Sequence, residues 1–278
     1  VGENVQQYTF NLSPDERRLA VNVSDPASSN VDLWIHDLDR GIRTRLTFHD
    51  AVDRATVWTS DGQSVLYYSM RDSAAGIYRK AVSGVEPARL VLASSDVLWP
   101  ESVSADGRFL LYTRLAPRTG GDIWVLPLDG GDPFPYLQTP FEEGWSALSP
   151  DGRWVAYFSE ESGREEIYVS PFPEPTGKWQ VSTNEGDRPR WSADGTRLYY
   201  LGNDDHVMMA TVDGSDDAFR VGKVERLFEV PAAARPGTIY DVFDDGERFL
   251  VNTRGREIAN DRLVLVQNWA SGLGRPRE

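Results

Sequence analysis

The chain has 278 residues, 40% of them hydrophobic, which is enough to bury a full core, and its lack of cysteine excludes disulfides, zinc–thiolate sites and thiol catalysis. The formal net charge of −14 argues against nucleic acid and anionic membrane surfaces as partners, because phosphate neutralisation needs a basic surface. No stretch of 18 apolar residues is present, so we expect no membrane span within the chain, and the first residues lack the basic start and apolar run of a signal peptide.

A turn motif built around Ser-x-Asp-Gly recurs six times, and each copy precedes a short apolar run. The aspartates of these turns are, in chain order, Asp15, Asp61, Asp106, Asp151, Asp194 and Asp245. Their spacings are 46, 45, 45, 43 and 51 residues. Repeats of roughly 40–45 residues are typical of four-stranded propeller blades. The sequence therefore predicts an all-β fold, a six-bladed β-propeller of four-stranded antiparallel blades.

The first repeat shows the four predicted strands of a blade. They lie around Leu12, after the turn at Leu19–Val21, at Leu33–Trp34 and at Arg45–Phe48. Continuous apolar runs bounded by turns are typical of strands buried on both faces, as in a blade between two neighbours. We expect one domain over 1–278, with blades at approximately 7–48, 53–93, 98–139, 144–183, 188–230 and 238–270.

The repeated Asp-Gly step is interpreted as a two-residue hairpin turn. Glycine adopts positive φ without strain, and aspartate accepts hydrogen bonds from nearby backbone amides. A turn that recurs in every blade cannot mark one active site, so these aspartates are expected to be structural. Two copies depart from the motif: Glu16 replaces glycine in the first, and Phe243–Asp244 replaces the serine position in the last. We expect those outer blades to be irregular.

The last blade is predicted to supply only three strands of its own, near 238–243, 248–253 and 262–269. Either Val1–Gln6 adds a short outer strand, or the blade keeps an exposed edge that can pair with another chain. We favour completion by residues upstream of Val1 in a longer parent protein.

Two segments carry a family resemblance. Trp191–Tyr200 and Asp122–Gly131 resemble the TolB-type, WD-repeat-like propeller repeat. The ending, Arg248–Thr253 followed by Leu263–Leu273, resembles the close of propellers found at the C-terminus of bacterial serine/threonine protein kinases. The resemblance implies a soluble, periplasmic or otherwise extracytoplasmic sensor or interaction domain, excised from a larger signalling protein. No kinase motif is present, so kinase activity is not carried over.

Residues suited to catalysis are sparse. The histidines, His36, His49 and His206, are scattered without metal-ligand spacing, and no Gly-x-Ser-x-Gly nucleophile motif exists. We therefore expect no catalytic residue, no metal site and no cofactor. A carboxylate-only Ca²⁺ site stays open as an alternative, because Ca²⁺ takes oxygen ligands.

The connections between blades differ from copy to copy, whereas the tight turns on the opposite face repeat. Folding alone does not require this divergence, so we expect a protein, peptide or small-molecule ligand at the funnel mouth on the variable-loop face. The candidate residues there are Arg54, Trp99, Glu143, Trp145, Asp187, Arg188 and Arg190. Tryptophan and arginine on loops are favoured binding anchors, although Trp99 and Trp145 could instead pack between blades. The alternative function is an enzyme or enzyme-accessory propeller, such as a peptidase gating domain, a hydrolase or a lyase.

Overall fold

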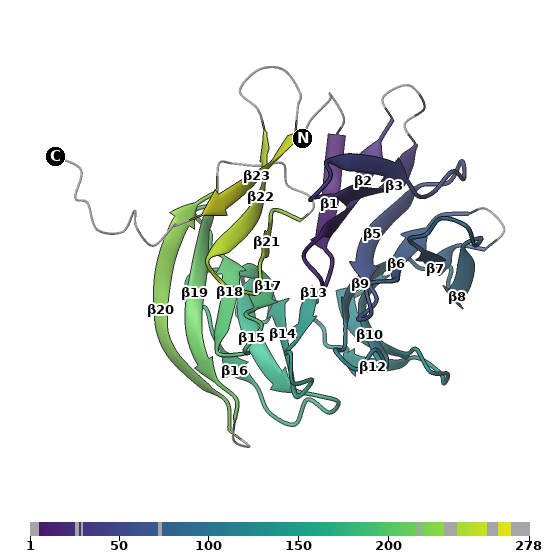
Figure 1. Ribbon diagram of the computed structural model, residues 1–278. Coiled ribbons are helices and arrows are strands. Elements are labelled where there is room, and N and C mark those ends of the chain that lie inside the picture. The colour runs from purple at the N-terminus through teal and green to yellow at the C-terminus, as the bar shows by residue number, and fades with distance from the viewer. Residues whose placement is uncertain are drawn as a thin grey trace.

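The computed structural model describes residues 6–25, 28, 30–71, 74–215, 218–230, 238–254 and 261–267. This part of the chain contains strands and no helix, and its strands form six antiparallel sheets (Figure 1). Figure 1 shows the sheets arranged in a ring, with the first strand of each sheet nearest the centre. The predicted six-bladed β-propeller is therefore confirmed.

The strands follow the chain around the ring, one sheet per blade. Blade 1 consists of β1 (Gln6–Leu12), β2 (Arg18–Ser24), β3 (Val31–Asp37) and β4 (Ile42–Arg45). Blade 2 consists of β5 (Asp53–Trp58), β6 (Ser64–Ser69), β7 (Gly76–Ala81) and β8 (Arg89–Ala93). Blade 3 consists of β9 (Leu98–Val103), β10 (Phe109–Ala116), β11 (Gly120–Pro127) and β12 (Phe134–Leu137).

The second half of the ring is built in the same way until its last blade. Blade 4 consists of β13 (Glu143–Leu148), β14 (Trp154–Ser159), β15 (Glu166–Pro171) and β16 (Trp179–Gln180). Blade 5 consists of β17 (Asp187–Trp191), β18 (Arg197–Leu201), β19 (His206–Asp213) and β20 (Arg220–Glu229). Blade 6 consists of β21 (Tyr240–Val242), β22 (Arg248–Arg254) and β23 (Asp261–Gln267).

The outer strand of blade 1 begins earlier than the sequence predicted. In blade 1 the fourth strand was expected at Arg45–Phe48, but β4 ends at Arg45. The reason is the short hairpin that follows β3, which pairs Asp37 directly with Ile42 and so brings the chain into the sheet sooner. After β4, Leu46 is buried in the core, whereas Phe48 is 70% exposed.

The core lies between neighbouring blades, as expected for strands that are apolar on both faces. Tyr67, Tyr112 and Tyr157 occupy the same repeat position in blades 2, 3 and 4, and each is at most 2% exposed. Burial of one large side chain of this kind contributes about 1.5–3 kcal/mol. The repeated apolar positions therefore account for the stacking of the blades.

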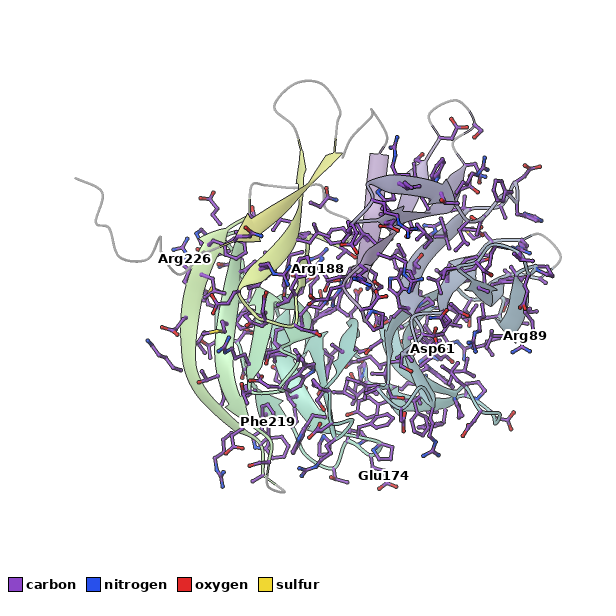
Figure 2. The ribbon with its side chains drawn as sticks, viewed as in Figure 1. Asp61, Arg89, Glu174, Arg188, Phe219 and Arg226 are labelled. Atoms are coloured by element: carbon purple, nitrogen blue, oxygen red, sulfur yellow. The ribbon has the colours of Figure 1, made fainter. Side chains whose placement is uncertain are left out.

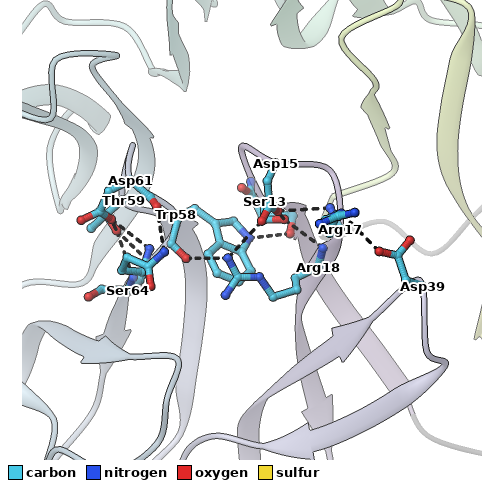
Figure 3. A network of polar contacts seen from close by, with 12 residues as sticks. Ser13, Asp15, Arg17, Arg18, Asp39, Trp58, Thr59, Asp61 and Ser64 are labelled. Atoms are coloured by element: carbon cyan, nitrogen blue, oxygen red, sulfur yellow. Dashed lines mark hydrogen bonds and ion pairs between the residues drawn. The ribbon is translucent and has the colours of Figure 1, made fainter.

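The tight turns contain four residues, not the two that the sequence suggested. In blade 1 the Ser13 N–H bonds to the carbonyl of Arg18, which closes a loop over 14–17. The serine hydroxyl donates to Asp15 at 2.5 Å, and the same carboxylate accepts the Arg17 N–H (Figure 3). Blade 2 uses the Thr59 hydroxyl in the serine position. This side-chain network spans a longer turn than an isolated Asp-Gly step can.

Blade 6 has three strands in the described part of the chain, as predicted. Gln6 belongs to the inner strand of blade 1, where it pairs with Ser24. The other residues of the segment proposed to add a strand, 1–5, lie outside the described residues. The prediction of completion from a longer parent stays a prediction.

The two irregular turns meet where blade 6 contacts blade 1. Glu16, at φ 58°, takes the left-handed conformation that glycine occupies in the other turns. Its carboxylate accepts the Asp244 N–H and pairs with Arg248 at 3.2 Å. An apolar cluster containing Phe10 and Phe243 joins the same two blades. The departures from the repeat thus fall at the junction that closes the ring.

Candidate functional site

A cavity of about 460 Å³ lies on the axis of the ring and opens between the tight turns. We call it the axial well. Its wall receives one residue from the fourth position before the turn aspartate in every blade: Asn11, Val57, Ser102, Ala147, Arg190 and Asp241. Its mouth receives the residue just before each turn aspartate: Pro14, Ser60, Ala105, Pro150, Ala193 and Asp244. The wall is chemically asymmetric although the repeats that form it are alike.

Glu101 of β9 lies at the side of the axial well and joins blade 3 to blade 4. One carboxylate oxygen accepts the Thr113 hydroxyl at 2.6 Å and the Trp145 N–H at 2.9 Å. The other accepts the N–H of Ser146 at 2.7 Å and its hydroxyl at 2.6 Å. Burial raises the pKa of Glu101 although all four hydrogen bonds act to lower it. Its oxygens are committed to the junction, so its role is structural.

Arg190 and Asp241 form the charged part of the wall. The Arg190 Nε lies 3.5 Å from a carboxylate oxygen of Asp241. The other oxygen of Asp241 accepts the Leu12 N–H of blade 1 at 2.9 Å, and burial raises the pKa of this carboxyl. A ligand in the axial well therefore meets a neutral ion pair beside uncharged polar groups such as Asn11 and Ser102.

A second, much smaller cavity of about 30 Å³ lies toward the variable-loop end of the axis. Three of the predicted site residues line it, namely Trp99, Trp145 and Arg190. Arg190 also lines the axial well, as do Asn11 and Glu101. The indole N–H of Trp99 is buried and has no hydrogen-bond partner among the described residues. Three of the seven predicted residues therefore lie at the axis.

Asp187, Arg188 and Trp145 form one contact group beside this cavity. Arg188 and Asp187 are an ion pair in which both side chains are less than 10% exposed. The Arg188 guanidinium lies 4.6 Å from the centre of the Trp145 ring, and Figure 2 shows Arg188 near the centre of the ring of blades. Bulges interrupt β13 and β17 here, and Trp145 and Arg188 take φ of 50° and 52°. Left-handed backbone at non-glycine residues is strained, and bulges of this kind change the direction of nearby side chains.

The remaining two predicted residues lie outside both axial cavities. Glu143 is 2% exposed at the junction of blades 3 and 4, where it accepts the Thr139 hydroxyl and where burial raises its pKa. Arg54 donates to the Met70 sulfur at 3.0 Å. The structure therefore brings Trp99, Trp145 and Arg190 together and leaves Glu143 and Arg54 apart from them.

Sequence reasoning missed the polar wall of the axial well, above all Glu101, Ser102 and Asp241. A signal was present in the sequence. The residue four positions before the turn aspartate changes in polarity from repeat to repeat, whereas the residue that follows it is always apolar. The register that points this position at the axis depends on the bulges, for which the sequence carries no motif.

Among the described residues, the histidines do not form part of a metal site. His36 is 4% exposed, and its pKa is lowered to about 4 by burial, with a contribution from Arg43. No group of three or more histidine, cysteine or acidic side chains is arranged to hold a metal ion in the described ranges. Within the same ranges, no helix is long and apolar enough to cross a membrane.

No protein-family model matches the chain. No curated protein matches it either. Solved structures do match in fold. TolB from Acinetobacter baumannii is similar with a TM-score of 0.70 and 18% identity, covering 91% of this chain and 61% of that one. An oligogalacturonate lyase in complex with manganese has a TM-score of 0.62 and 15% identity, covering 92% and 73%.

A puromycin-hydrolysing peptidase from Mycobacterium tuberculosis has a TM-score of 0.65 and 16% identity, covering 96% of this chain and 46% of that one. This chain thus spans 61% of the Acinetobacter TolB structure and less than half of the peptidase. At these identities the likeness shows the fold alone, a six-bladed β-propeller like that of TolB. Because the matched structures also include a lyase and a peptidase, the fold does not assign an activity.

Proposed function

We propose that this propeller is a non-catalytic binding module that holds a segment of another polypeptide in its axial well. The observation that carries the proposal is the axial well, a cavity of about 460 Å³ whose wall differs in every blade. An asymmetric wall suits one asymmetric ligand, and a cavity of this size suits a few side chains of an inserted segment. The resemblance to extracytoplasmic sensing propellers supports the same role outside the cytoplasm.

The wall supports binding better than catalysis. Its one ion pair, Arg190–Asp241, is internally neutralised, and the four hydrogen bonds to Glu101 occupy both of its oxygens. A general base or nucleophile needs a polar atom free to reach the substrate. Enzymes remain the alternative because a lyase and a peptidase share the fold. Turnover of a peptide, ester or glycoside by pure protein that is lost in Arg190→Ala would establish that alternative.

Selection of random displayed peptides against the pure protein tests the proposal. We expect peptides that bind the wild type and lose at least tenfold in affinity with Ala147→Phe, which fills the wall, or with Ala105→Trp at the mouth. The control is Val85→Phe, because Val85 is 87% exposed and lies away from the axis. Peptides bound equally by all four proteins would refute a site in the axial well.

The site predicted at the variable-loop end is tested with the same peptides. Trp99 lines only the smaller cavity, whereas Arg190 lines both. If the ligand enters between the tight turns, Arg190→Ala weakens binding and Trp99→Ala does not. Loss of binding in Trp99→Ala, with Ala105→Trp unaffected, would instead place entry at the loop end.

A further inference from the structure

A further cavity, of about 430 Å³, lies between blades 4 and 5 on the tight-turn face. We call it the blade 4–5 pocket. The two linings share four residues, so the two cavities are neighbours; the shared residues are Ser149, Pro150, Trp191 and Ala193. A segment held in the axial well can therefore reach the blade 4–5 pocket with an adjoining side chain.

Aromatic rings form the inner part of the blade 4–5 pocket. Trp154, Trp191 and Phe219 line it, and the Phe219 ring centre lies 5.1 Å from that of Trp154 and 6.1 Å from that of Trp191. The indole N–H of Trp154 donates to the Gly214 carbonyl, and that of Trp191 donates to the Ala147 carbonyl. Both donors are used, and Trp154 and Phe219 are only 3% and 2% exposed, so a ligand meets mainly the π surface of the partly exposed Trp191. Figure 2 places Phe219 near the end of the blade 5 hairpin.

The outer part of the pocket is acidic. Its lining includes the carboxylates of Asp151, Asp194 and Asp213 and no lysine, arginine or histidine. A hydrogen bond from the Ser192 hydroxyl lowers the pKa of Asp194, and one from the Ser215 hydroxyl lowers that of Asp213, so both are ionised at neutral pH. Arg153 and Arg220 lie at the edge, where they bond the Gly214 carbonyl and Asp213.

The junction of blades 1 and 2 shows what the equivalent position holds elsewhere in this chain. There Arg18 lies over Trp58, with its guanidinium carbon 5.1 Å from the ring centre, and donates to the Gly62 carbonyl at 2.9 Å (Figure 3). Trp58 and Trp191 occupy the same repeat position, and each bonds the preceding blade through its indole N–H. In blade 4, however, the residue equivalent to Arg18 is Trp154.

We propose that the blade 4–5 pocket binds a guanidinium or ammonium group, supplied by an arginine or lysine side chain of the polypeptide held in the axial well. The aromatic floor and acidic rim together suit a cation, which is attracted to π surfaces and to carboxylates. Blade 1 fills this place with its own Arg18. In blade 4 the Arg153 guanidinium carbon lies 5.8 Å from the centre of the Trp154 ring, but Arg153 does not line the pocket, whose interior is left to a partner. The inference rests on the proposed function for the assumption that the ligand is part of a polypeptide. The pocket itself does not depend on the proposed function.

The probe is N-acetyl-arginine amide, and its matched control is the neutral isostere N-acetyl-citrulline amide. Binding is followed through the tryptophan indole signals in NMR, with the Trp191 signal assigned by Trp191→Phe. We expect the arginine compound to shift the Trp154 and Trp191 signals saturably and the citrulline compound to leave them in place. Equal shifts with both compounds, or none with either, would overturn the inference.

Repeat position provides fold-compatible variants. Thr196 is exposed, lines the pocket and occupies the place held by Arg17, Arg108 and Arg153 in blades 1, 3 and 4 and by Glu247 in blade 6. Thr196→Arg should weaken the arginine probe at least fivefold, and Thr196→Glu should strengthen it at least twofold. The matched control, Gln63→Arg, makes a similar change at the same repeat position in blade 2, away from the pocket, and should have no effect.

The two proposals can fail separately. If peptides bind through the axial well but contain no enriched basic residue, and Thr196→Arg leaves their affinity unchanged, the cation pocket is wrong and the proposed function stands. If the arginine probe binds as expected but no peptide responds to Ala147→Phe, the pocket stands and the proposed function fails. Thermal melting of each variant verifies that it is folded before binding is compared.

Discussion

The aspartates of the tight turns lie exposed on one face of the ring, whereas Asp241 is buried and Glu101 is half-buried where inner strands of neighbouring blades meet. Hydrogen bonds from serine and threonine hydroxyls lower the pKa of turn residues such as Asp61 and Asp194. Burial raises the pKa of Glu101 and Asp241 despite their own hydrogen bonds. The same functional group therefore serves two purposes that differ in location and in electrostatics.

The comparison shows where repetition in a sequence is informative. Turn carboxylates recur in every blade because each hairpin needs the same closure. Junction carboxylates occur singly, since each joins one particular pair of blades: Glu101 links blade 3 to blade 4, and Asp241 links blade 6 to blade 1. A residue that does not recur from blade to blade can therefore be one that stabilises a junction between blades, and not only one that binds a ligand.

The largest expected effect is at Glu101. Glu101→Ala removes the acceptor of four hydrogen bonds and leaves the buried N–H groups of Trp145 and Ser146 without it. We expect the free energy of unfolding to fall on the order of 3 kcal/mol, measured by urea denaturation. The neighbouring Ser102→Ala removes one hydrogen bond, to the Leu148 N–H, and should cost about 1 kcal/mol. Equal costs for the two variants would contradict a special role for Glu101.

A smaller loss is expected at the ring-closing junction. Asp241→Asn keeps the shape of the side chain but removes the charge that faces Arg190 at 3.5 Å. We expect a loss of about 1–2 kcal/mol in urea denaturation, because a hydrogen-bonded charge is left without its partner. Asp244→Asn, an exposed residue of the same blade, is the control and should be close to neutral. A larger loss of stability for Asp244→Asn than for Asp241→Asn would show that the turn, and not Asp241, stabilises the junction of blades 6 and 1.

Much of the fold could be predicted from the sequence because local patterns repeat. The spacing of the turn aspartates gave the number of blades, and the apolar runs gave the second and third strands. Some outer strands were predicted less accurately. β4 is polar and largely exposed, so its sequence lacks the apolar pattern of a buried strand. The four-residue turns depend on hydroxyl–carboxylate bonds, which spacing alone does not reveal.

The candidate site was only partly predictable. Trp99, Trp145 and Arg190 lie at the axis, but Glu143 is buried at a junction, because the position that starts an inner strand faces the neighbouring blade there. Bulges at Trp145 and Arg188 change the direction of nearby side chains, and no residue pattern predicts these bulges. The size of a cavity depends on all of the side chains that line it, which single positions do not encode.

A modest effect is expected in the turns. Asp106→Ala removes the acceptor of the Ser104 hydroxyl and of the Arg108 N–H. The urea midpoint should fall by less than in Glu101→Ala, because the freed groups are close to solvent and can bond water. Peptide binding in the axial well should persist, as Asp106 does not line it. Loss of binding in a fully folded Asp106→Ala protein would show that the turns contribute to the site.

The smallest effect, and the sharpest test of the comparison, is the dependence of each loss on pH. For Glu101 the folded pKa lies above the ordinary value of 4.5, so the native state binds the proton more tightly. Its stabilising contribution is complete below that value and is lost as the pH rises through the folded pKa. The stability difference between wild type and Glu101→Gln should therefore shrink as the pH rises above about 4.5.

Asp106 has the opposite sign, because its folded pKa lies below the ordinary value of 3.8, chiefly through the hydrogen bond from the Ser104 hydroxyl. Its contribution is present above that value and is lost as the pH falls through the folded pKa. The loss caused by Asp106→Ala should consequently fade in acid, where the loss caused by Glu101→Gln is greatest. Urea denaturation of both variants and the wild type across this range measures the two trends. Parallel trends would show that the junction and turn carboxylates share one electrostatic environment, contrary to the contrast drawn between them.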